Sequence, residues 1–354
     1  MKKNLFFGLC AASMLLMTSC DKEAFGGRFG EQETNVTLSV SLPELQTATR
    51  AYGTGVNAKY LQYAVYSLDA QGAINEEIKK VDNVVMTGTN PVGTTIDLKL
   101  VPGSKYSIVL WADAYGRGNT DSPFEVTMGT TANTMVIDGS IKANDDLADA
   151  FFGSFEITVN SSETSGYVIT EYGKTENVGS TLALKRPFAQ LNIATTNDDL
   201  DLAQKSDFTI THTSVTIENV ENTLDLRTGV VSGAPVATTY AMNAIPGTMQ
   251  TNQNSTHTLL AMAYILMPAD KETVKVTFGY SDGNTPKFKS YGNVPLRRNW
   301  RTNIYGELFT NDVNITVEIA PNFADQNGVD DDPTIDQDKD EQYSGNNGFP
   351  VTNP

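Results

Sequence analysis

Short runs in which apolar and polar residues alternate are the feature that most narrows the possible folds of this chain. From Val36 to Leu42 every second side chain is apolar, and comparable runs recur as far as residue 319. Alternation with a period of two is typical of a half-buried β-strand, and Gly-, Pro- and Asn-rich turns separate several of the runs. No amphipathic stretch is long enough for the helix of a βαβ crossover. The sequence therefore predicts an all-β protein.

The expected strands are short and follow one another closely. Pro102-Gly103 lies between two β-rich runs, and this pattern predicts a hairpin. A helical turn is expected at residues 145–150, where acidic side chains suit a helix start. The runs expected to be strands are 36–42, 61–68, 95–101, 106–112, 124–128, 135–141, 151–159, 181–184, 189–194, 208–217, 259–267, 273–280, 302–309 and 313–319.

Length and a change of pattern divide the chain into parts. A chain of 354 residues is long enough for two ordinary domains, and the alternation is interrupted near residues 175–181. We therefore predict two all-β sandwiches in tandem, at residues 34–180 and 181–322. No period of 20–50 residues recurs, which argues against a solenoid or a propeller. Residues 323–354 are rich in Asp, Gly, Asn and Pro, so a disordered acidic tail is expected.

The first twenty residues have the pattern of a secretion signal. Two lysines precede an uncharged apolar stretch from Leu5 to Met17, which is too short to span a bilayer and suits the core of a signal peptide. Small residues then precede Cys20, as in the cleavage site of bacterial lipoproteins. We expect residues 1–19 to be removed, Cys20 to become the lipidated N-terminus, and residues 20–33 to form a tether. The alternatives are a free thiol at Cys20 and a signal that stays uncleaved as an anchor.

Charge and composition argue against several classes of function. The formal net charge is −17, with 25 Lys and Arg against 42 Asp and Glu, and loss of Lys2 and Lys3 with the signal makes it −19. Such a chain lacks the cations that neutralise nucleic-acid phosphates, so no nucleic-acid partner is expected. The two histidines, His212 and His257, are expected at the surface, and the mature chain would hold no thiol. We therefore expect no metal, cofactor or disulfide.

The chain lacks the common sequence motifs of catalytic sites. The motifs G-x-S-x-G, H-E-x-x-H and G-x-x-x-x-G-K-[ST] do not occur. The run from Asp336 to Asp340 has the opening spacing of a calcium loop, but Glu341 stands where the loop requires Gly. Asp198, Asp199 and Asp201 are too close in sequence to flank a glycosidic bond and are interpreted as a solvated turn or helix start. We therefore predict that the protein is not an enzyme.

Two further groups of side chains have both a structural and a functional interpretation. Trp111 follows three apolar residues and is expected to pack inside the sandwich, although an exposed Trp would stack on a sugar ring. Arg297, Arg298 and Arg301 form the one concentrated positive patch. We interpret it as a solvated turn, and an intersubunit salt bridge is the alternative.

Three stretches of the chain resemble the fimbrillin-like surface lipoproteins of Bacteroides-type bacteria, which are relatives of the type V pilins. The first is Val36–Leu42 with the Thr47-Ala48-Thr49-Arg50-Ala51 that follows it. The second is Leu147–Gly153, and the third joins Leu184–Asn192 with Val294–Gly306. Together with the lipoprotein signal, the likeness spans residues 1–322.

The resemblance implies two transthyretin-like β-sandwich domains and a lipid anchor that holds the protein at the outer membrane, on the cell surface. Asp21-Lys22-Glu23 likewise resembles the charged tag that directs such lipoproteins outward. In the family's pilins an Arg-specific protease releases the N-terminal strand, and a strand of the next subunit fills the empty groove. The implied partners are other fimbrillin-like subunits and a host or glycan receptor.

The candidate exchanged strand is the edge strand that carries Val36, Leu38, Val40 and Leu42. Burial of four such side chains at about 1.5–3 kcal/mol each contributes about 6–12 kcal/mol as an upper bound. A groove that has lost such a strand binds a replacement avidly. Arg50, in a linker of small residues, is the candidate cleavage site, and an ordinary loop arginine is the alternative.

The sequence thus predicts a lipid-anchored structural or adhesion protein of a surface fibre. Residues 325–354 lack the alternating apolar pattern of a donor strand. Either residues 313–319 are the donor of a polymerising subunit, or the protein is a tip, anchor or non-polymerising subunit. A surface glycan-binding lipoprotein is the alternative function.

Overall fold

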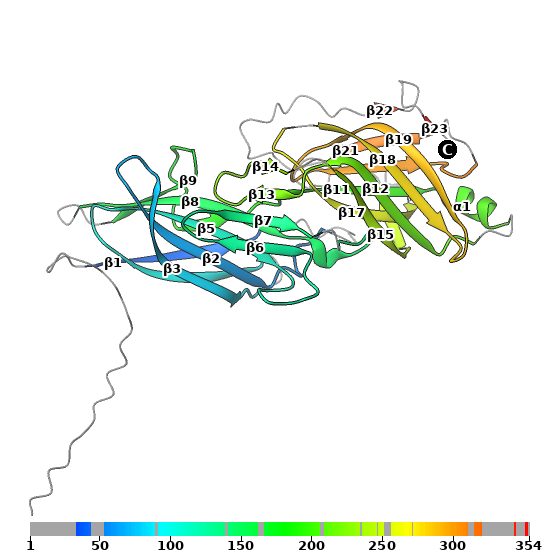
Figure 1. Cartoon of the computed structure of the whole chain (residues 1–354). Coiled ribbons are helices and arrows are strands. Elements are labelled where there is room, and N and C mark those ends of the chain that lie inside the picture. Colours follow the sequence, from blue (N-terminus) through cyan, green and yellow to red (C-terminus); the bar gives the residue numbers. More distant parts are fainter. Residues whose placement is uncertain are drawn as a thin grey trace, which may run out of the picture.

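Almost all of the regular structure is β-sheet, as the alternation predicts, and the N-terminal and C-terminal halves of the chain lie end to end (Figure 1). Among the described residues no helix is long and apolar enough to cross a membrane. The computed structural model describes residues 33–43, 53–88, 91–138, 141–161, 166–205, 209–233, 236–245, 247–250, 256–270, 272–310, 315–320, 343–344 and 351–352.

Two sheets face each other in the N-terminal half. Their strands are β1 (Thr34–Ser41), β2 (Tyr60–Leu68), β3 (Ile74–Val85), β4 (Gly93–Leu100), β5 (Lys105–Asp113), β8 (Phe151–Val159), β9 (Tyr167–Glu171) and β10 (Thr181–Ala183). The smaller sheet has the order β10-β1-β4, and the larger has the order β3-β2-β5-β8-β9. Apolar side chains from both sheets form one buried cluster between them.

The C-terminal half also consists mainly of two sheets. Its strands are β11 (Phe188–Thr195), β12 (His212–Val220), β15 (Val236–Ala244), β16 (Gly247–Gln250), β17 (Thr256–Leu266), β18 (Glu272–Ser281), β19 (Pro286–Leu296), β20 (Arg301–Gly306), β21 (Ile315–Ala320), β22 (Tyr343–Ser344) and β23 (Val351–Thr352). One sheet has the order β16-β17-β11-β20-β21-β22, and the other has the order β15-β12-β18-β19-β23.

A fifth sheet joins the two halves. It has the order β14-β13-β7-β6 and consists of β6 (Phe124–Met128), β7 (Asn133–Ile137), β13 (Thr223–Asp225) and β14 (Val231–Ser232). Strands from both sides of the predicted domain boundary therefore pair with each other. Pairing also crosses the boundary at β10, which lies just after residue 180 and pairs with β1. The boundary itself remains a prediction.

The larger N-terminal sheet is covered on both faces. On β5, Ile108 and Leu110 belong to the cluster beneath β1, whereas Val109 and Trp111 belong to a second cluster that extends into the C-terminal half. Strands buried on both faces have continuous apolar sequences instead of alternating ones, and this is the pattern of β5. Trp111 is fully buried and packs edge-to-face on Phe124, as the sequence predicts.

In the described part of the chain, two short helical segments begin where acidic residues cluster. The 3-10 turn η1 (Asp146–Ala148) lies within residues 145–150, and Asp145 caps it. The helix α1 (Asn197–Gln204) begins after Thr196, whose side chain accepts a hydrogen bond from the Asp199 N–H. Both clusters therefore start helical segments, but Asp199 is 1 % exposed and accepts hydrogen bonds from the N–H groups of Phe309 and Thr310, so it is not solvated.

The hairpin predicted around Pro102-Gly103 is wrong. The turn exists, but β4 pairs with β1 whereas β5 pairs with β2 and β8. The chain crosses from one sheet to the facing sheet at this turn. Both strands bury an apolar face in the same cluster, so alternation alone does not distinguish such a crossing from a hairpin.

Surface predictions were wrong for several polar residues. His212 is exposed, but His257 is 7 % exposed and its ring packs edge-to-face on Tyr305. Arg298 is half-buried and donates hydrogen bonds to the carbonyls of Met267 and Gly229. Burial lowers its pKa to about 10. Arg301 is also buried, so the arginine patch is not a solvated turn.

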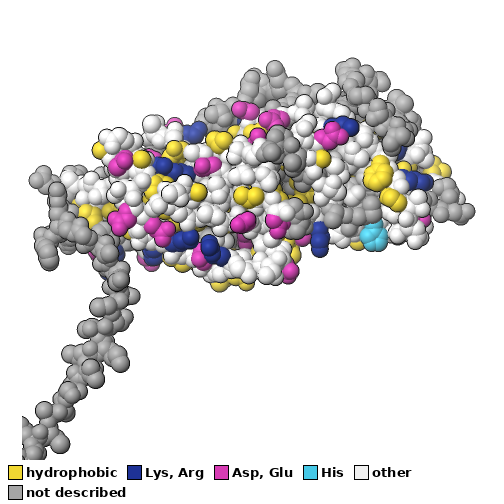
Figure 2. Space-filling view, viewed as in Figure 1, with side chains coloured by type: hydrophobic (Ala, Val, Ile, Leu, Met, Phe, Trp, Pro, Cys, Tyr) yellow, Lys and Arg dark blue, Asp and Glu magenta, His cyan; other side chains and the backbone are white. Residues whose placement is uncertain are grey.

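Charged side chains of both signs are interspersed over the visible face of the N-terminal half (Figure 2). Exposed ion pairs occur in both halves: Lys185 pairs with Glu171 at 2.9 Å in the N-terminal half, and Lys275 pairs with Glu218 at 2.8 Å in the C-terminal half. Exposed pairs of this kind contribute little to stability. The stability of the fold therefore comes mainly from its buried clusters.

We expect Leu38→Ala to lower the free energy of unfolding by about 2–5 kcal/mol, because Leu38 is fully buried in the cluster between the N-terminal sheets. The change is measured as a shift of the urea unfolding midpoint. Ser39→Ala, at the exposed neighbouring position, is the matched control and should shift the midpoint little. Equal shifts for the two variants would contradict the packing described for β1.

Candidate functional site

The apolar face of β1 fills a groove in the N-terminal half. Val36, Leu38 and Val40 are fully buried, and Leu42 is 3 % exposed. The side chains between them are exposed or half-buried, so one face of the strand is buried and the other faces solvent. The sequence predicted this burial, and the structure brings all four apolar side chains into one cluster.

The backbone of β1 is paired along both sides. It pairs antiparallel with β4 over eight residues, from Thr34 opposite Leu100 to Ser41 opposite Gly93. On its other side it pairs in parallel with β10, and Ser39, Val40 and Ser41 face Thr181, Leu182 and Ala183. The expectation of an edge strand is therefore wrong, because β1 is the central strand of its sheet.

This central position makes the two neighbouring strands depend on β1. In the described structure neither β4 nor β10 pairs with any other strand. Loss of β1 would leave the backbone groups that face it on both strands without partners, and it would expose the apolar groove beneath. Unpaired strand edges beside an apolar groove readily bind another extended segment.

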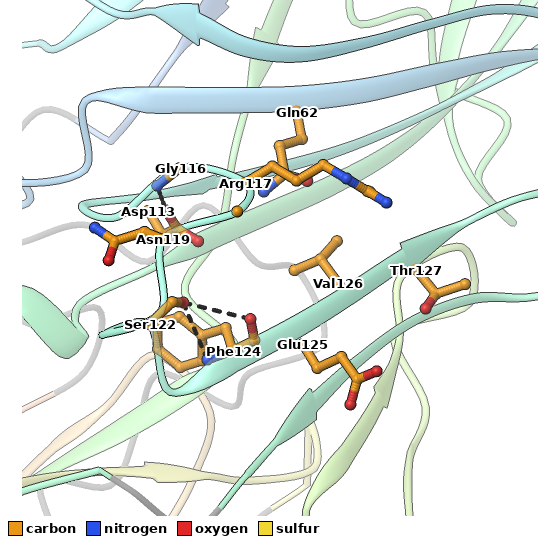
Figure 3. Close-up of a pocket in the computed structure, with 11 residues that line it drawn as sticks. Gln62, Asp113, Gly116, Arg117, Asn119, Ser122, Phe124, Glu125, Val126 and Thr127 are labelled. Atoms are coloured by element: carbon orange, nitrogen blue, oxygen red, sulfur yellow. Dashed lines mark hydrogen bonds between the residues drawn. The ribbon is translucent and has the colours of Figure 1, made fainter.

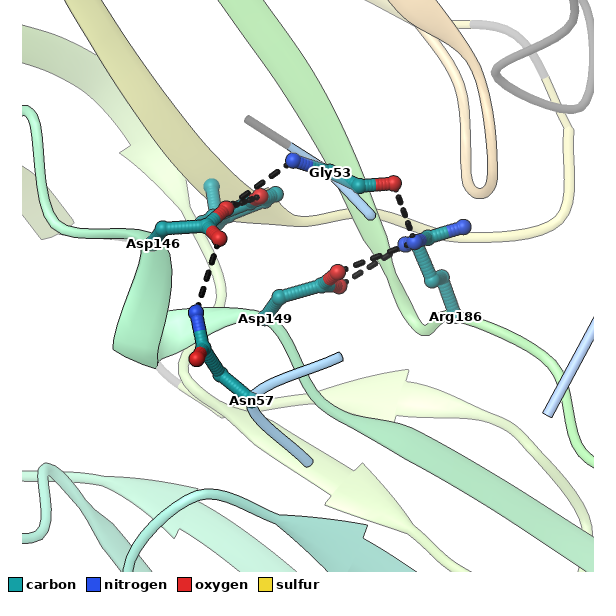
Figure 4. Close-up of polar contacts among 6 residues, drawn as sticks. Gly53, Asn57, Asp146, Asp149 and Arg186 are labelled. Carbon is teal, nitrogen blue, oxygen red and sulfur yellow. Dashed lines mark hydrogen bonds and ion pairs between the residues drawn. The ribbon is translucent and has the colours of Figure 1, made fainter. Parts of the chain in front are cut away.

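Beyond β1 the chain resumes in a buried polar network. Gly53 has a positive φ of 78°, and both of its backbone polar groups are bound. Its N–H donates to Asp146 Oδ1 at 2.9 Å, and its carbonyl accepts from Arg186 Nη2 at 2.7 Å (Figure 4). The chain is therefore fixed at Gly53, shortly after the predicted linker.

A buried ion pair forms the centre of this network. Arg186 Nε and Nη2 donate to the two carboxylate oxygens of Asp149 at 2.7 and 2.9 Å, and both side chains are about 1 % exposed (Figure 4). The guanidinium also lies 4.6 Å from the centre of the Phe151 ring. Burial acts to lower the pKa of Arg186, but the charge and hydrogen bonds of Asp149 outweigh it, and the pKa lies above its ordinary value.

A second carboxylate, that of Asp146, extends the network to Asn57 and Tyr264. Asp146 accepts hydrogen bonds from the Gly53 N–H, from Asn57 Nδ2 and from the Tyr264 hydroxyl, each at 2.9 Å. Burial is the main cause that raises the pKa of Asp146, and the nearby charge of Asp149 adds to it. Since Tyr264 lies on β17, the network connects Gly53 to the C-terminal half.

The groove and the network hold two successive segments of the chain. The strand Thr34–Ser41 is held by the groove, whereas the chain at Gly53 is held by Arg186 and Asp146. Gly55, with a positive φ of 68°, passes within contact of Phe151 and Leu42, and a Cβ here would lie 3.0 Å from the Phe151 ring.

The sequence-predicted site residues fall into two groups. Val36, Leu38, Val40 and Leu42 are brought together, and their exchange remains a prediction. Cys20 and Arg50 lie outside the described residues. Within the described residues no group of His, Cys, Asp or Glu is placed to hold a metal ion.

Sequence reasoning did not assign the buried ion pair. Asp149 and Arg186 both lie inside the stretches that carry the family resemblance, but no role was predicted for either. An arginine followed by Pro-Phe-Ala in an acidic chain is a signal that could have marked Arg186. Nothing in the sequence indicates that Asp149 is its partner.

Comparison with known proteins gives a family for the chain. A model described as a family of unknown function (DUF6562) matches residues 28–344. The chain belongs to this family. The match covers the β1 groove, the polar network and nearly all strands of both halves. None of the curated proteins compared with the chain matches it.

Solved structures of fimbrial proteins match most of the chain at low sequence identity. A fimbrial assembly protein from Parabacteroides distasonis is 14 % identical, with a TM-score of 0.42, and the match covers 82 % of this chain and 97 % of that protein. The fimbrial anchor protein Mfa2 from Porphyromonas gingivalis is 11 % identical, with a TM-score of 0.39 and coverage of 80 % and 97 %.

We expect Arg186→Met to destabilise the protein by about 3–5 kcal/mol, because it leaves the carboxylate of Asp149 buried without its cation. The double variant Arg186→Met with Asp149→Leu should recover most of this loss, since no buried charge of the pair then remains. Urea unfolding of the wild type, both single variants and the double variant measures the coupling. Additive losses in the double variant would contradict a tightly coupled pair.

We also expect stability to depend on pH through Asp146. Burial raises the pKa of Asp146 in the folded protein above 3.8, its ordinary value in an unfolded chain. At a pH between 3.8 and the raised pKa, the folded state holds a proton that the unfolded chain has lost. The free energy of unfolding therefore falls as pH rises through this window. Asp146→Asn should flatten this part of the stability curve, measured as urea midpoints from about pH 4 to pH 8.

The difference between the stability curves of the wild type and Asp146→Asn isolates the contribution of Asp146 from that of other carboxyls. Asp113, whose pKa burial also raises, titrates in the wild type and the variant alike and cancels in their difference. Asp270→Asn, at an exposed position, is the matched control and should leave the curve unchanged. Parallel curves for the wild type and Asp146→Asn would show that this prediction is wrong.

Proposed function

We propose that this protein is a lipid-anchored structural or adhesion subunit of a cell-surface fibre that binds its partner by strand exchange at the β1 groove. The observation that supports this most is the central position of β1, whose four apolar side chains are buried and whose removal would leave β4 and β10 unpaired. The action is binding, and no chemical turnover is part of the proposal.

The replacement strand is expected to resemble β1. It must present apolar side chains at alternate positions to match those of Val36, Leu38 and Val40, and it must pair antiparallel with β4. The chain's own β21 (Ile315–Ala320) has such alternation in its sequence, but it pairs with β20 in this structure. A strand from another fimbrillin-like subunit is therefore the proposed partner.

Cleavage after Arg50 would separate the two parts of the chain that the structure holds differently. Arg50 is followed by Ala51 and Tyr52, and the chain is fixed from Gly53 onward by Asp146 and Arg186. The new N-terminus would thus begin two residues before an anchored point. The body of the protein would remain intact while the segment before Arg50 becomes free to leave.

The order of these features along the chain also determines what cleavage does to anchoring. Cys20, the proposed lipidated residue, and β1 lie on the same side of Arg50. A cleaved subunit would therefore lose its own membrane anchor together with β1, whereas an uncleaved subunit would keep both. We propose that the uncleaved protein stays at the outer membrane on the cell surface as an anchor or accessory subunit, and that the cleaved protein enters a fibre.

We expect an Arg-specific protease to cut the membrane-derived protein after Arg50, and the cleaved body to bind a synthetic peptide of residues 33–43. Mass spectrometry of the released fragment identifies the cut and shows whether Cys20 carries acyl chains. Fluorescence anisotropy of the labelled peptide measures binding, because a bound strand of eleven residues tumbles with the whole protein.

Two controls make the experiment decisive. Arg50→Lys keeps the charge but should resist the Arg-specific protease and bind no peptide, since β1 stays attached. A peptide with Ser at positions 36, 38 and 40 should fail to bind the cleaved body, because the groove is apolar. A cleaved body that stays monomeric and binds neither peptide would refute strand exchange.

A further inference from the structure

A cavity of about 330 Å³ lies on the face of the larger N-terminal sheet that points away from β1. It is bounded by Gln62 on β2, by the loop that follows β5, and by the first residues of β6 (Figure 3). Its size is at the lower end of the range for small-molecule sites, roughly 300–1,000 Å³. On β2, Leu61 and Tyr63 face the β1 cluster, so Gln62 between them points to the opposite side.

One buried polar group in this cavity lacks a partner. Gln62 is 2 % exposed, and its Oε1 has no hydrogen-bond partner among the described residues. A buried polar atom without a partner costs free energy, so most such atoms in proteins are satisfied by protein, water or ligand. Figure 3 shows the Gln62 side chain extending into the space between the loop and β6.

The loop that bounds the cavity is rigidly held. Asp113 is 1 % exposed and accepts hydrogen bonds from Trp111 Nε1 at 2.7 Å and from the N–H groups of Tyr115 and Gly116 at 2.9 and 2.8 Å. Asn83 Oδ1 accepts from the Arg117 N–H at 2.6 Å. The cavity is therefore preformed, which lowers the cost of binding a ligand.

The two walls of the cavity differ in character. Gln62 and Arg117 provide hydrogen-bonding groups on one side, and Val126 and Phe124 of β6 provide an apolar surface on the other (Figure 3). A ligand that matches both walls has hydroxyl groups along one edge and C–H groups on a face. A hydroxyl both donates and accepts, so it can bind either end of the Gln62 amide as well as the guanidinium of Arg117.

The charge of the site favours a neutral ligand. Arg117 is 3.5 Å from Asp82 and is partly neutralised by it, and Glu125 stands beside the apolar wall. The whole chain carries a net charge of −17, which repels anions. We propose that this cavity binds a neutral hexopyranose residue, with its hydroxyl edge on Gln62 and Arg117 and its C–H face on Val126.

Saturation-transfer NMR measures the binding of sugars to the full protein, held in a detergent that has no sugar headgroup. The probes are D-glucose, D-galactose, D-mannose and N-acetyl-D-glucosamine, with D-glucuronic acid and N-acetylneuraminic acid as the anionic arm. We expect transfer to at least one neutral sugar with a dissociation constant in the millimolar range or tighter. Gln62→Met and Val126→Trp should each weaken it at least about tenfold, which corresponds to about 1.4 kcal/mol.

Matched variants outside the cavity make the result specific. Gln71→Met and Val168→Trp introduce the same side chains at other positions and should leave binding unchanged. Val126 is half-buried at the cavity wall, so Val126→Trp decides the question even if Gln62→Met fails to fold. No transfer to any neutral sugar at 5 mM, stronger transfer to the anionic sugars, or undiminished binding by Val126→Trp would each overturn the proposal. These outcomes do not depend on β1, so they are distinct from failure of strand exchange.

Discussion

The rest of the N-terminal half depends on the pairing of β1 along both of its backbone edges. β4 and β10 belong to one sheet only because β1 lies between them, and the buried faces of Val36, Leu38 and Val40 close the core beneath. Hydrogen bonding and apolar burial are thus concentrated in one short segment near the start of the chain. Removal of β1 would therefore cost the N-terminal half backbone pairing and apolar burial at the same time, and a replacement strand would restore both.

Much of the fold follows from local sequence pattern, and the failures have physical causes. Strands with one dry face, such as β1 and β4, alternate clearly and were predicted near their observed bounds. β3 was missed because both of its faces are largely exposed and its charged side chains show no alternation. The crossing at Pro102-Gly103 was predicted as a hairpin because the pattern of apolar residues shows which face is buried but not which strand is its neighbour.

The candidate site was predictable only where it is local. Four apolar residues within seven positions indicated the buried strand, whereas the network around Arg186 assembles Gly53, Asp146 and Tyr264 from distant parts of the chain. The cavity beside Gln62 depends likewise on a loop and a strand that meet only after folding. An unpaired amide oxygen has no signature in a sequence. Such features become visible when the partners that each polar atom has, or lacks, are known.

The fifth sheet has a consequence for how such proteins can change over evolutionary time. β13 comes from the C-terminal half but pairs with β7 of the N-terminal half, and the N–H of Leu226 donates to the carbonyl of Asn133 at 2.7 Å. A gene fusion that replaced one half with an unrelated domain would remove the pairing between β7 and β13 and leave an exposed strand edge. The two halves are therefore expected to be inherited together, and variation to accumulate in loops instead of by module shuffling.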